Sequence, residues 1–152
     1  MNIEFKDITK DNLIDVFKLK VKPEQKGMVS PNVYSIAESK VYENFFPKAL
    51  YVENDLVGFL MYGINPENED QVWIIRLMID EKYQGKGFGR DAMLKAIDTL
   101  KEIYDPPSIF LSVESKNDLA KKLYHSLGFK ATGEILFGEL VHRLDLINQN
   151  NG

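Results

Sequence analysis

The segment from Val72 to Ile79 limits the possible folds of this chain more than any other. Its eight residues are apolar except for Arg76, a pattern typical of a central strand that is buried on both faces. A glycine-rich turn and a helical pattern over about 89–104 follow, and then a second apolar run at 109–113. Two buried strands joined by a helix require a parallel pair with a right-handed crossover. We therefore expect a sheet with helices packed on it.

Before this segment, the sequence predicts one strand and two helices. Ile3 and Phe5 alternate with polar residues as in a half-buried strand, and Thr9 offers an N-cap to a first helix. A second helix is expected over about 31–46, because Ser30-Pro31 places a capping residue before a proline suited to a helix start. The inward faces of these helices are predicted at Leu13, Val16 and Phe17, and at Val33, Ala37, Val41 and Phe45.

Two hairpins complete the predicted sheet. One joins 49–52 to 56–62, turning at Glu53-Asn54-Asp55 and ending in a polar loop at 65–70. A helix over 115–127 then turns Leu119, Ala120, Leu123, Tyr124 and Leu127 inward, and Gly128 closes it in the left-handed conformation. The last two strands, 129–137 and 139–147, meet at Gly138. The predicted order is β-α-α-β-β-β-α-β-α-β-β, an α/β fold with a mixed sheet.

Composition narrows the classes of function. With 152 residues, 44% of them hydrophobic, we expect a single domain over 1–147 and a flexible polar tail at 148–152. The chain has no cysteine, which excludes disulfides and a thiolate nucleophile and fits a reducing cytosol. A net charge of -4 disfavours nucleic-acid binding. No leader pattern or long apolar run is present, and the histidines lack metal-ligand spacing, so we expect a cytoplasmic protein without membrane contact or metal.

The turn Gln84-Gly85-Lys86-Gly87-Phe88-Gly89 is the strongest chemical signal. Glycines at alternate positions let the backbone turn so that several N–H groups point into one concavity at a helix N-terminus, where phosphate binds. Lys86 and Arg90 add positive charge. The nucleotide-hydrolase loop and the dinucleotide fingerprint both differ from this pattern, because Arg90 and Asp91 follow Gly89. The alternative interpretation is a plain strand-to-helix connection.

Two motifs together carry a family resemblance. Gln84-x-x-Gly87-x-Gly89 after an apolar strand, and Asn117-x-x-Ala120-x-x-Leu123-Tyr124-x-x-x-Gly128-Phe129, resemble the GNAT superfamily of acyl-CoA-dependent N-acetyltransferases. Within it, the segments 73–89 and 50–63 look most like bacterial spermine/spermidine (diamine) N-acetyltransferases. The resemblance implies the GNAT fold, in which the central parallel strands splay apart at a bulge, and acetyl-CoA as the cosubstrate.

The resemblance also implies roles for individual residues. The backbone amides of Leu77 and Ile79 are expected to bind the pantetheine arm, with the Leu77 N–H also facing the thioester oxygen as an oxyanion donor. Asn117 is expected to contact the pantetheine, or else only to cap its helix. Tyr124 is expected to protonate the leaving thiolate as general acid, or else to be a core tyrosine. The coenzyme pyrophosphate is expected on the amides of Gln84, Gly85, Lys86, Gly87, Phe88, Gly89 and Arg90.

The acceptor side is less defined. Many members of the family carry an acid on the central strand, whereas Trp73 and Ile75 occupy those positions here. The remaining candidates for a base or an amine-binding acid are Glu38, Glu43, Glu53 and Glu114, or no dedicated base. The acidic loop Glu67, Glu69 and Asp70 is a further candidate for polyamine binding. Arg76 is expected to meet a carboxylate or carbonyl near the acceptor pocket, because an unpaired buried guanidinium is costly.

The expected function is transfer of an acetyl group from acetyl-CoA to a primary amine. Because no cysteine is present to carry the acyl group, we expect direct attack in a ternary complex, with a polyamine such as spermidine or spermine as acceptor. The alternatives are a protein N-terminus, a lysine or an antibiotic amine, or a non-catalytic acyl-CoA sensor. A homodimer formed through the C-terminal edge strands is also expected.

Overall fold

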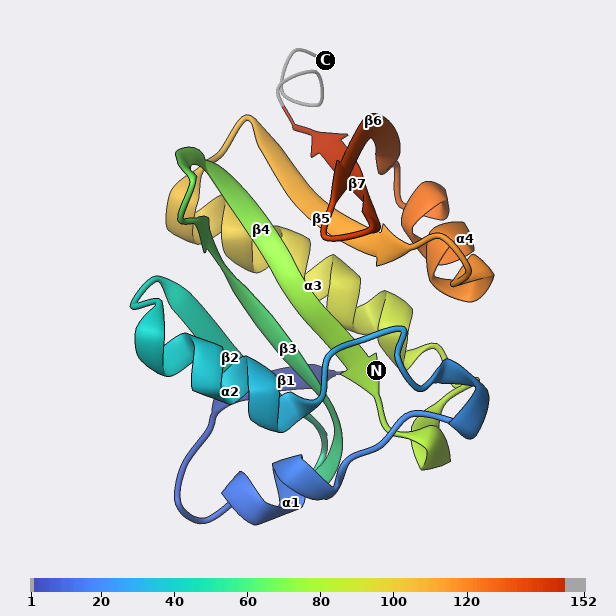
Figure 1. Cartoon of the computed structure of the whole chain (residues 1–152). Coiled ribbons are helices and arrows are strands. Elements are labelled where there is room, and N and C mark those ends of the chain that lie inside the picture. Colours follow the sequence, from blue (N-terminus) through green and yellow to red (C-terminus); the bar gives the residue numbers. More distant parts are fainter. Residues whose placement is uncertain (1, 147–152) are drawn as a thin grey trace.

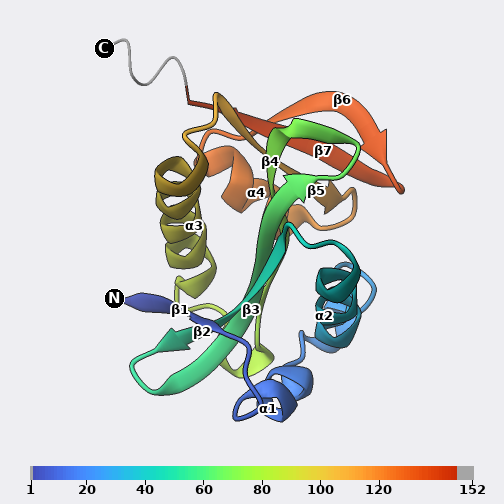
Figure 2. The same cartoon turned by 90° about the vertical axis from the view of Figure 1, so that its left-hand side faces the viewer.

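A computed structural model describes residues 2–146, which form one seven-stranded sheet with helices on both faces (Figures 1 and 2). The order of elements matches the sequence prediction. The strands are β1 (Ile3–Asp7), β2 (Phe45–Val52), β3 (Asp55–Asn65), β4 (Asn68–Ile79), β5 (Ser108–Glu114), β6 (Lys130–Leu136) and β7 (Glu139–Asp145). The helices are α1 (Leu13–Lys18), α2 (Asn32–Val41), α3 (Phe88–Tyr104) and α4 (Asp118–Ser126), with 3-10 turns η1 (Pro23–Gln25) and η2 (Glu81–Tyr83).

The sheet has the strand order β1-β2-β3-β4-β5-β7-β6 and is mixed, as predicted. Only β4 and β5 pair in parallel, and the other neighbours are antiparallel. One core cluster lies under α3 and α4 and includes Met93, Leu100 and Phe129. A second cluster lies under α1 and α2 and includes Val16, Phe59 and Met61. Helices on both faces explain why β4 reads as a nearly continuous apolar run.

The parallel pair β4–β5 separates soon after it forms. Pairing is limited to Val72 with Ile109 and Trp73 with Phe110, although both strands continue for several residues. On its other side β4 carries a bulge, because Met61 pairs with Arg76 while Tyr62 pairs with Ile74, leaving Ile75 unmatched. A bulge bends the strand and re-aims its side chains. The expected splay is therefore present, and Figure 1 shows the two strands diverging.

The prediction for the second helix was wrong in extent and in its buried face. α2 ends at Val41, and Phe45 already belongs to β2. Val33 and Val41 are exposed, Val41 to 77%, while Asn32 and Ser35 are buried. The Asn32 amide donates to the Val16 carbonyl at 3.0 Å, which satisfies a polar side chain that hydropathy assigns to the surface.

Smaller differences affect the other helices and the loops. The first helix begins at Leu13, with Asn12 rather than Thr9 at its N-cap, and the Thr9 hydroxyl instead accepts from the Asp11 N–H. Phe17 is 39% exposed rather than turned inward. Leu119 is exposed on α4, which is shorter than predicted. The polar loop 65–70 is a tight hairpin instead, because β4 already begins at Asn68. The predicted tail at 148–152 lies outside the described residues.

Candidate active site

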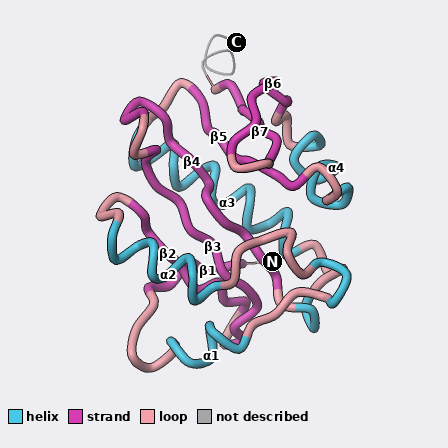
Figure 3. Tube along the Cα trace, in the orientation of Figure 1, coloured by secondary structure: helices cyan, strands magenta, loops and turns pink. Residues whose placement is uncertain are grey.

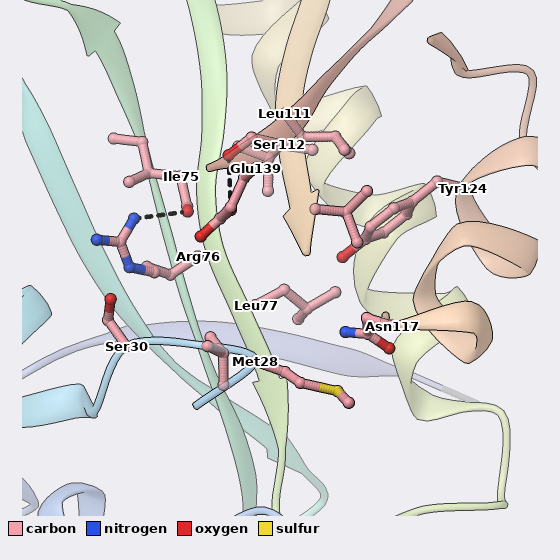
Figure 4. A pocket seen from close by; sticks show the side chains of 13 residues that line it. Met28, Ser30, Ile75, Arg76, Leu77, Leu111, Ser112, Asn117, Tyr124 and Glu139 are labelled. Atoms are coloured by element: carbon pink, nitrogen blue, oxygen red, sulfur yellow. Dashed lines mark hydrogen bonds between the residues drawn. The ribbon is translucent and has the colours of Figure 1, made fainter. Parts of the chain in front are cut away.

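A small cavity of about 50 Å³ lies where β4 and β5 separate (Figure 4). Its wall is formed by residues 74–77 of β4, 111–113 of β5 and the loop residues 28–30, completed by Asn117, Tyr124 and Glu139. Figure 3 shows the mostly irregular connection between α1 and α2 that supplies the loop residues. The structure thus brings four sequence-predicted site residues to one place, namely Arg76, Leu77, Asn117 and Tyr124.

Leu77 and Ile79 lie in the part of β4 that has no paired strand on its β5 side. On the opposite side they pair with Leu60 and Gly58 of β3. Leu77 lines the cavity, whereas Ile79 packs against the core under α3. One edge of β4 is therefore available to an extended ligand over these residues, while the binding role of the two amides stays a prediction.

The backbone path of the turn between β4 and α3 is fixed by glycine conformation and by side-chain hydrogen bonds. Gly85 and Gly87 have φ of 81° and 85°, in the left-handed region that glycine adopts without strain. The Gln84 amide donates to the Ile79 carbonyl at 2.9 Å and exchanges two hydrogen bonds with Gln25. The buried Asp80 carboxylate accepts from the Lys20 and Lys82 backbone amides. These contacts fix the path of the turn.

The backbone amides of this turn form a nest, defined here as the N–H groups of residues 84–90. None of them donates to another group in the described part of the chain, and the first α3 amide with a partner belongs to Asp91. A Cβ added to Gly85 or Gly87 would meet nothing within 4 Å, so no other part of the described chain packs against the turn at these two glycines. The nest also lies at the N-terminus of a 17-residue helix, where the helix dipole favours an anion.

The nest and the cavity are neighbours because the start of α3 packs against α4. A Cβ added to Gly89 would lie 3.7 Å from Leu123 of α4. The Arg90 guanidinium donates to the Ser126 hydroxyl at 3.0 Å. Lys86 lies over the Tyr83 ring, with its ammonium 5.9 Å from the ring centre. A ligand seated on the nest could therefore extend along the splayed edge of β4 into the cavity.

Tyr124 reaches the cavity from α4, and Figure 4 shows its hydroxyl directed into it. Its ring meets Phe129 edge to face, with the ring centres 6.1 Å apart. Burial, assisted by the negative charge of Glu139, raises the pKa of Tyr124 to about 12. A phenol with so high a pKa stays protonated at neutral pH, so this hydroxyl can donate a proton or a hydrogen bond.

Asn117 has the capping role that the sequence offered as one of its two interpretations. Its side-chain oxygen accepts from the Ala120 N–H at 3.2 Å at the start of α4. Only the oxygen is used in this cap, and the side chain also lines the cavity. The amide NH₂ therefore remains available for a second contact.

Arg76 meets both kinds of partner that its position in an apolar strand required. Its guanidinium donates to the Glu38 carboxylate at 3.0 Å and to the Ile75 carbonyl at 3.0 Å. The two charged side chains are 22% and 21% exposed, so the pair is mostly shielded from water. Glu38 is therefore bound to Arg76 from the face covered by α2 and does not line the cavity.

The other predicted acids lie elsewhere. Glu43 is exposed in the turn after α2, and Glu53 is exposed in the β2–β3 turn with φ of 58°. Glu114 ends β5 outside the cavity wall. Glu69 and Asp70 lie at the start of β4, and Asp70 is six residues from Arg76, which is about 20 Å along a strand. None of these acids lines the cavity.

Sequence reasoning missed a carboxylate that does line the cavity. Glu139 begins β7, and its carboxylate accepts from the Ser112 hydroxyl at 2.9 Å. The predicted turn at Gly138 did place Glu139 at the head of the last strand. Only the pairing of Glu139 with Glu114 shows that this strand end lies beside the splay.

The two histidines contact each other, away from the cavity wall. Their Nε2 atoms are 3.1 Å apart, and His142 is fully buried with its Nδ1 3.1 Å from the Leu140 carbonyl. Within residues 2–146, no group of three or more His, Asp or Glu side chains could hold a metal ion. In that same range, no helix is both long and apolar enough to cross a membrane.

Comparisons with known proteins bear on the family of this chain. Residues 15–129 match the acetyltransferase (GNAT) family. The chain is 37% identical over 147 residues to the spermine/spermidine N(1)-acetyltransferase of Bacillus subtilis (strain 168), covering 93% of this chain and 97% of that protein.

Solved structures agree in fold. The PaiA N-acetyltransferase of Thermoplasma acidophilum, in complex with coenzyme A, gives a TM-score of 0.70 at 18% identity and covers 96% of this chain and 100% of that one. The spermidine N-acetyltransferase of Vibrio cholerae, in complex with CoA and spermine, gives a TM-score of 0.72 at 19% identity and covers 93% of this chain and 92% of that one. Together with the family match, these findings show that the chain belongs to the acetyltransferase (GNAT) family and is an acetyl-CoA-dependent N-acetyltransferase.

Proposed function

We propose that this enzyme transfers the acetyl group of acetyl-CoA to a primary amine of a polyamine such as spermidine or spermine. The observation that carries the choice of acceptor is the 37% identity, over nearly the full length of both chains, to a spermine/spermidine N(1)-acetyltransferase. The proposal is also supported by three features of the structure: the nest of amides without partners, the edge of β4 that has no paired strand beside Leu77, and the cavity lined by Leu77 and Tyr124.

The nest suits the coenzyme pyrophosphate. Seven successive amides without partners, at a helix N-terminus, present donors that a diphosphate would satisfy. The residues that would hold it are Gln84, Gly85, Lys86, Gly87, Phe88, Gly89 and Arg90. Leu77 and Ile79 would bind the pantetheine arm through their backbone, and the free NH₂ of Asn117 would assist.

The wall of the cavity would supply the catalytic groups. Acetyl-CoA brings the acetyl group as a thioester, and the Leu77 N–H would stabilise negative charge developing on the thioester oxygen. A donor of this kind is worth about 3 kcal/mol in other enzymes. Tyr124 would give a proton to the departing sulfur, since its hydroxyl stays protonated at neutral pH. Because the chain has no cysteine, the amine would attack directly while both substrates are bound.

A panel assay tests the proposed acceptor. The purified chain is mixed with acetyl-CoA and, in turn, spermine, spermidine, putrescine, a lysine peptide, a peptide with a free N-terminus and an aminoglycoside, and free CoA is measured with a thiol reagent. Release with the polyamines at least tenfold faster than with the peptides supports the proposal. If CoA is released faster with a peptide or the aminoglycoside than with the polyamines, the proposed polyamine acceptor is wrong and that amine takes its place. Stabilisation by acetyl-CoA without release for any amine would favour an acyl-CoA sensor.

A homodimer belongs to the same proposal. β6 is one of the two edge strands of the sheet, and most of its residues are exposed. Its pairing to β7 is also interrupted between Ala131 and Ile135. An edge with free backbone groups can pair with a second copy. Light scattering after size exclusion would give twice the 17.5 kDa chain mass if this edge is used.

A further inference from the structure

Glu139 is the single carboxylate among the described residues that line the cavity. It begins β7 directly after the turn residue Gly138, which has φ of 80°. Tyr124 and Leu77 belong to the same wall. This acid comes from β7, a strand on which the sequence analysis placed none of its candidates.

The position of the Glu139 carboxylate is fixed from one side only. Its Oε1 accepts from the Ser112 hydroxyl at 2.9 Å, and Figure 4 shows the side chain directed from β7 toward the part of the cavity where Ser112 and Ile75 lie. Within residues 2–146, no donor contacts Oε2 and no cation forms an ion pair with this side chain. One oxygen is thus anchored and the other is available to a ligand.

The cation nearest in the wall does not compete for this oxygen. Arg76 is paired with Glu38, and its remaining terminal nitrogen donates to the Ile75 carbonyl. The Arg76 Nε is buried without a partner, but no ion pair joins Arg76 to Glu139 in the described structure, so the Glu139 carboxylate has no paired cation. An ammonium group would supply one, and it is the form in which a primary amine, with a pKa near 10, exists at neutral pH.

We propose that Glu139 binds the ammonium of the acceptor beside the thioester and accepts the proton that it must lose before the nitrogen attacks. This inference rests on the proposed amine acetylation and gives it the acid–base residue that the central strand lacks. The influence of Glu139 on the pKa of Tyr124 agrees with it, because two groups that interact electrostatically lie at one reaction centre. Tyr124 and Glu139 would then act as acid and base on either side of the same carbonyl.

The protons balance in this scheme. A bond forms between the amine nitrogen and the acetyl carbon, and the bond between that carbon and the coenzyme sulfur breaks. The nitrogen begins as an ammonium and ends as an amide, so it loses two protons. The first passes to Glu139, directly or through one water, and then to solvent. The second replaces the proton that Tyr124 gives to the sulfur.

The test is the pH dependence of kcat/KM for spermidine in the wild type and in Glu139→Gln. With a base on the enzyme, ammonium is the productive form and the wild-type kcat/KM changes little between pH 7 and 9. Without the base, the variant depends on neutral amine from solution, whose concentration rises about tenfold per pH unit below pH 10. We expect a loss of about 100-fold at pH 7 that shrinks to less than about fivefold at pH 9.

Two further variants separate the chemical role from a structural one. Glu134→Gln makes the same charge change on the exposed β6 of the same hairpin and is expected to keep the wild-type rate and slope. Glu139→Asp retains the carboxylate and is expected to restore a flat profile at a reduced rate. Acetyl-CoA affinity, measured by calorimetry, is expected to stay within twofold in all three variants.

Parallel pH profiles for wild type and Glu139→Gln would overturn the inference, because a packing role lowers the rate equally at every pH. A fall in acetyl-CoA affinity matching the fall in rate would overturn it as well. If the wild type acetylates another amine in place of spermidine, the same comparison is made with that amine, so only the acceptor assignment fails. If no amine is acetylated, the proposed function fails and the role of Glu139 fails with it.

Discussion

The protonation of Tyr124 decides what the cavity can do at the scale of single residues. Burial and the charge of Glu139 raise the pKa of this phenol to about 12, above its ordinary value of 10.0. Because the pKa is raised, the Tyr124 hydroxyl keeps its proton in the folded protein throughout the range from pH 6 to 10. Its capacity to donate is therefore constant over that range, and any pH dependence of the rate must come from other groups.

Replacing Tyr124 by Phe removes the donor and keeps the ring against Phe129. We expect kcat to fall by about 100-fold, since a positioned proton donor contributes at least that much, while acetyl-CoA affinity changes by less than twofold. Steady-state kinetics and calorimetry measure the two quantities. Tyr104→Phe, on α3 and away from the cavity wall, is the matched control. Equal losses in kcat and affinity would make Tyr124 a packing residue.

The sequence predicts the residues of this site unevenly, for physical reasons. Asn117 and Tyr124 could be predicted because the family motif that they match lies within one short segment of the sequence. Glu139 could not, since its place depends on the register of β7 against β5, which no local pattern contains. For Arg76 the need for a partner was predictable and its identity was not, because Glu38 lies 38 positions away on α2.

At the scale of elements, the turn between β4 and α3 joins a strand with a free edge to a helix with free amides. Its shape depends on two glycines with positive φ, which any residue with a Cβ adopts only with strain. Its position depends on Gln84 and Asp80, whose side chains bind neighbouring backbone. Coenzyme binding is therefore expected to depend on this turn as a unit.

Replacing Gly87 by Val is expected to weaken acetyl-CoA binding by more than 100-fold, because the side chain would obstruct the nest at a position where no other part of the described chain packs. Calorimetric titration measures this. Gly133→Val is the matched control, since Gly133 also has a positive φ of 89° and no neighbour within 4 Å, but lies in β6. Thermal unfolding of both variants reports the shared backbone strain. Unchanged affinity in a folded Gly87→Val protein would refute the role of the turn.

The buried face of α2 gives a prediction for stability. The Ser35 hydroxyl is fully buried and has no hydrogen-bond partner in the described structure. Ser35→Ala removes this unpaired group and improves helix propensity, so we expect the free energy of unfolding to rise by about 1 kcal/mol. Val41→Ala, on the exposed face, is expected to change it by less than about 0.5 kcal/mol. Urea denaturation measures both, and a loss of stability in Ser35→Ala would show that the hydroxyl is paired.

Helices and strands could be predicted from the sequence where their apolar residues follow one clear periodicity, and less well where they do not. β4 and α3 carry strong apolar patterns; α3 appears at nearly the expected residues, and β4 ends where expected but begins earlier, at Asn68. α2 was misjudged because its buried face includes two polar residues, Asn32 and Ser35, and buried polar side chains leave no hydrophobic signal in the sequence. The splay was implied by the family resemblance alone, since Ile75, the bulged residue, is an ordinary strand former.

For the molecule as a whole, the net charge of -4 says little about the coenzyme and little about the acceptor. The coenzyme would be held by backbone amides, so an excess of acidic side chains does not oppose it. The acidic residues that the sequence offered for a polycation lie outside the cavity, and among the residues that the structure describes a single carboxylate, Glu139, lines it. In the proposed mechanism the amine is therefore recognised by Glu139 within the cavity, rather than by a wide acidic groove.

Acetylation of spermidine by the purified wild-type chain tests the central claim most directly. Protein, acetyl-CoA and spermidine are incubated at neutral pH, free CoA is measured, and the polyamine is analysed by mass spectrometry. The account predicts one equivalent of CoA for each spermidine that gains one acetyl group, with no product when the protein is left out. Acetyl-CoA that binds and stabilises the protein while spermidine, spermine and putrescine all remain unmodified would contradict it.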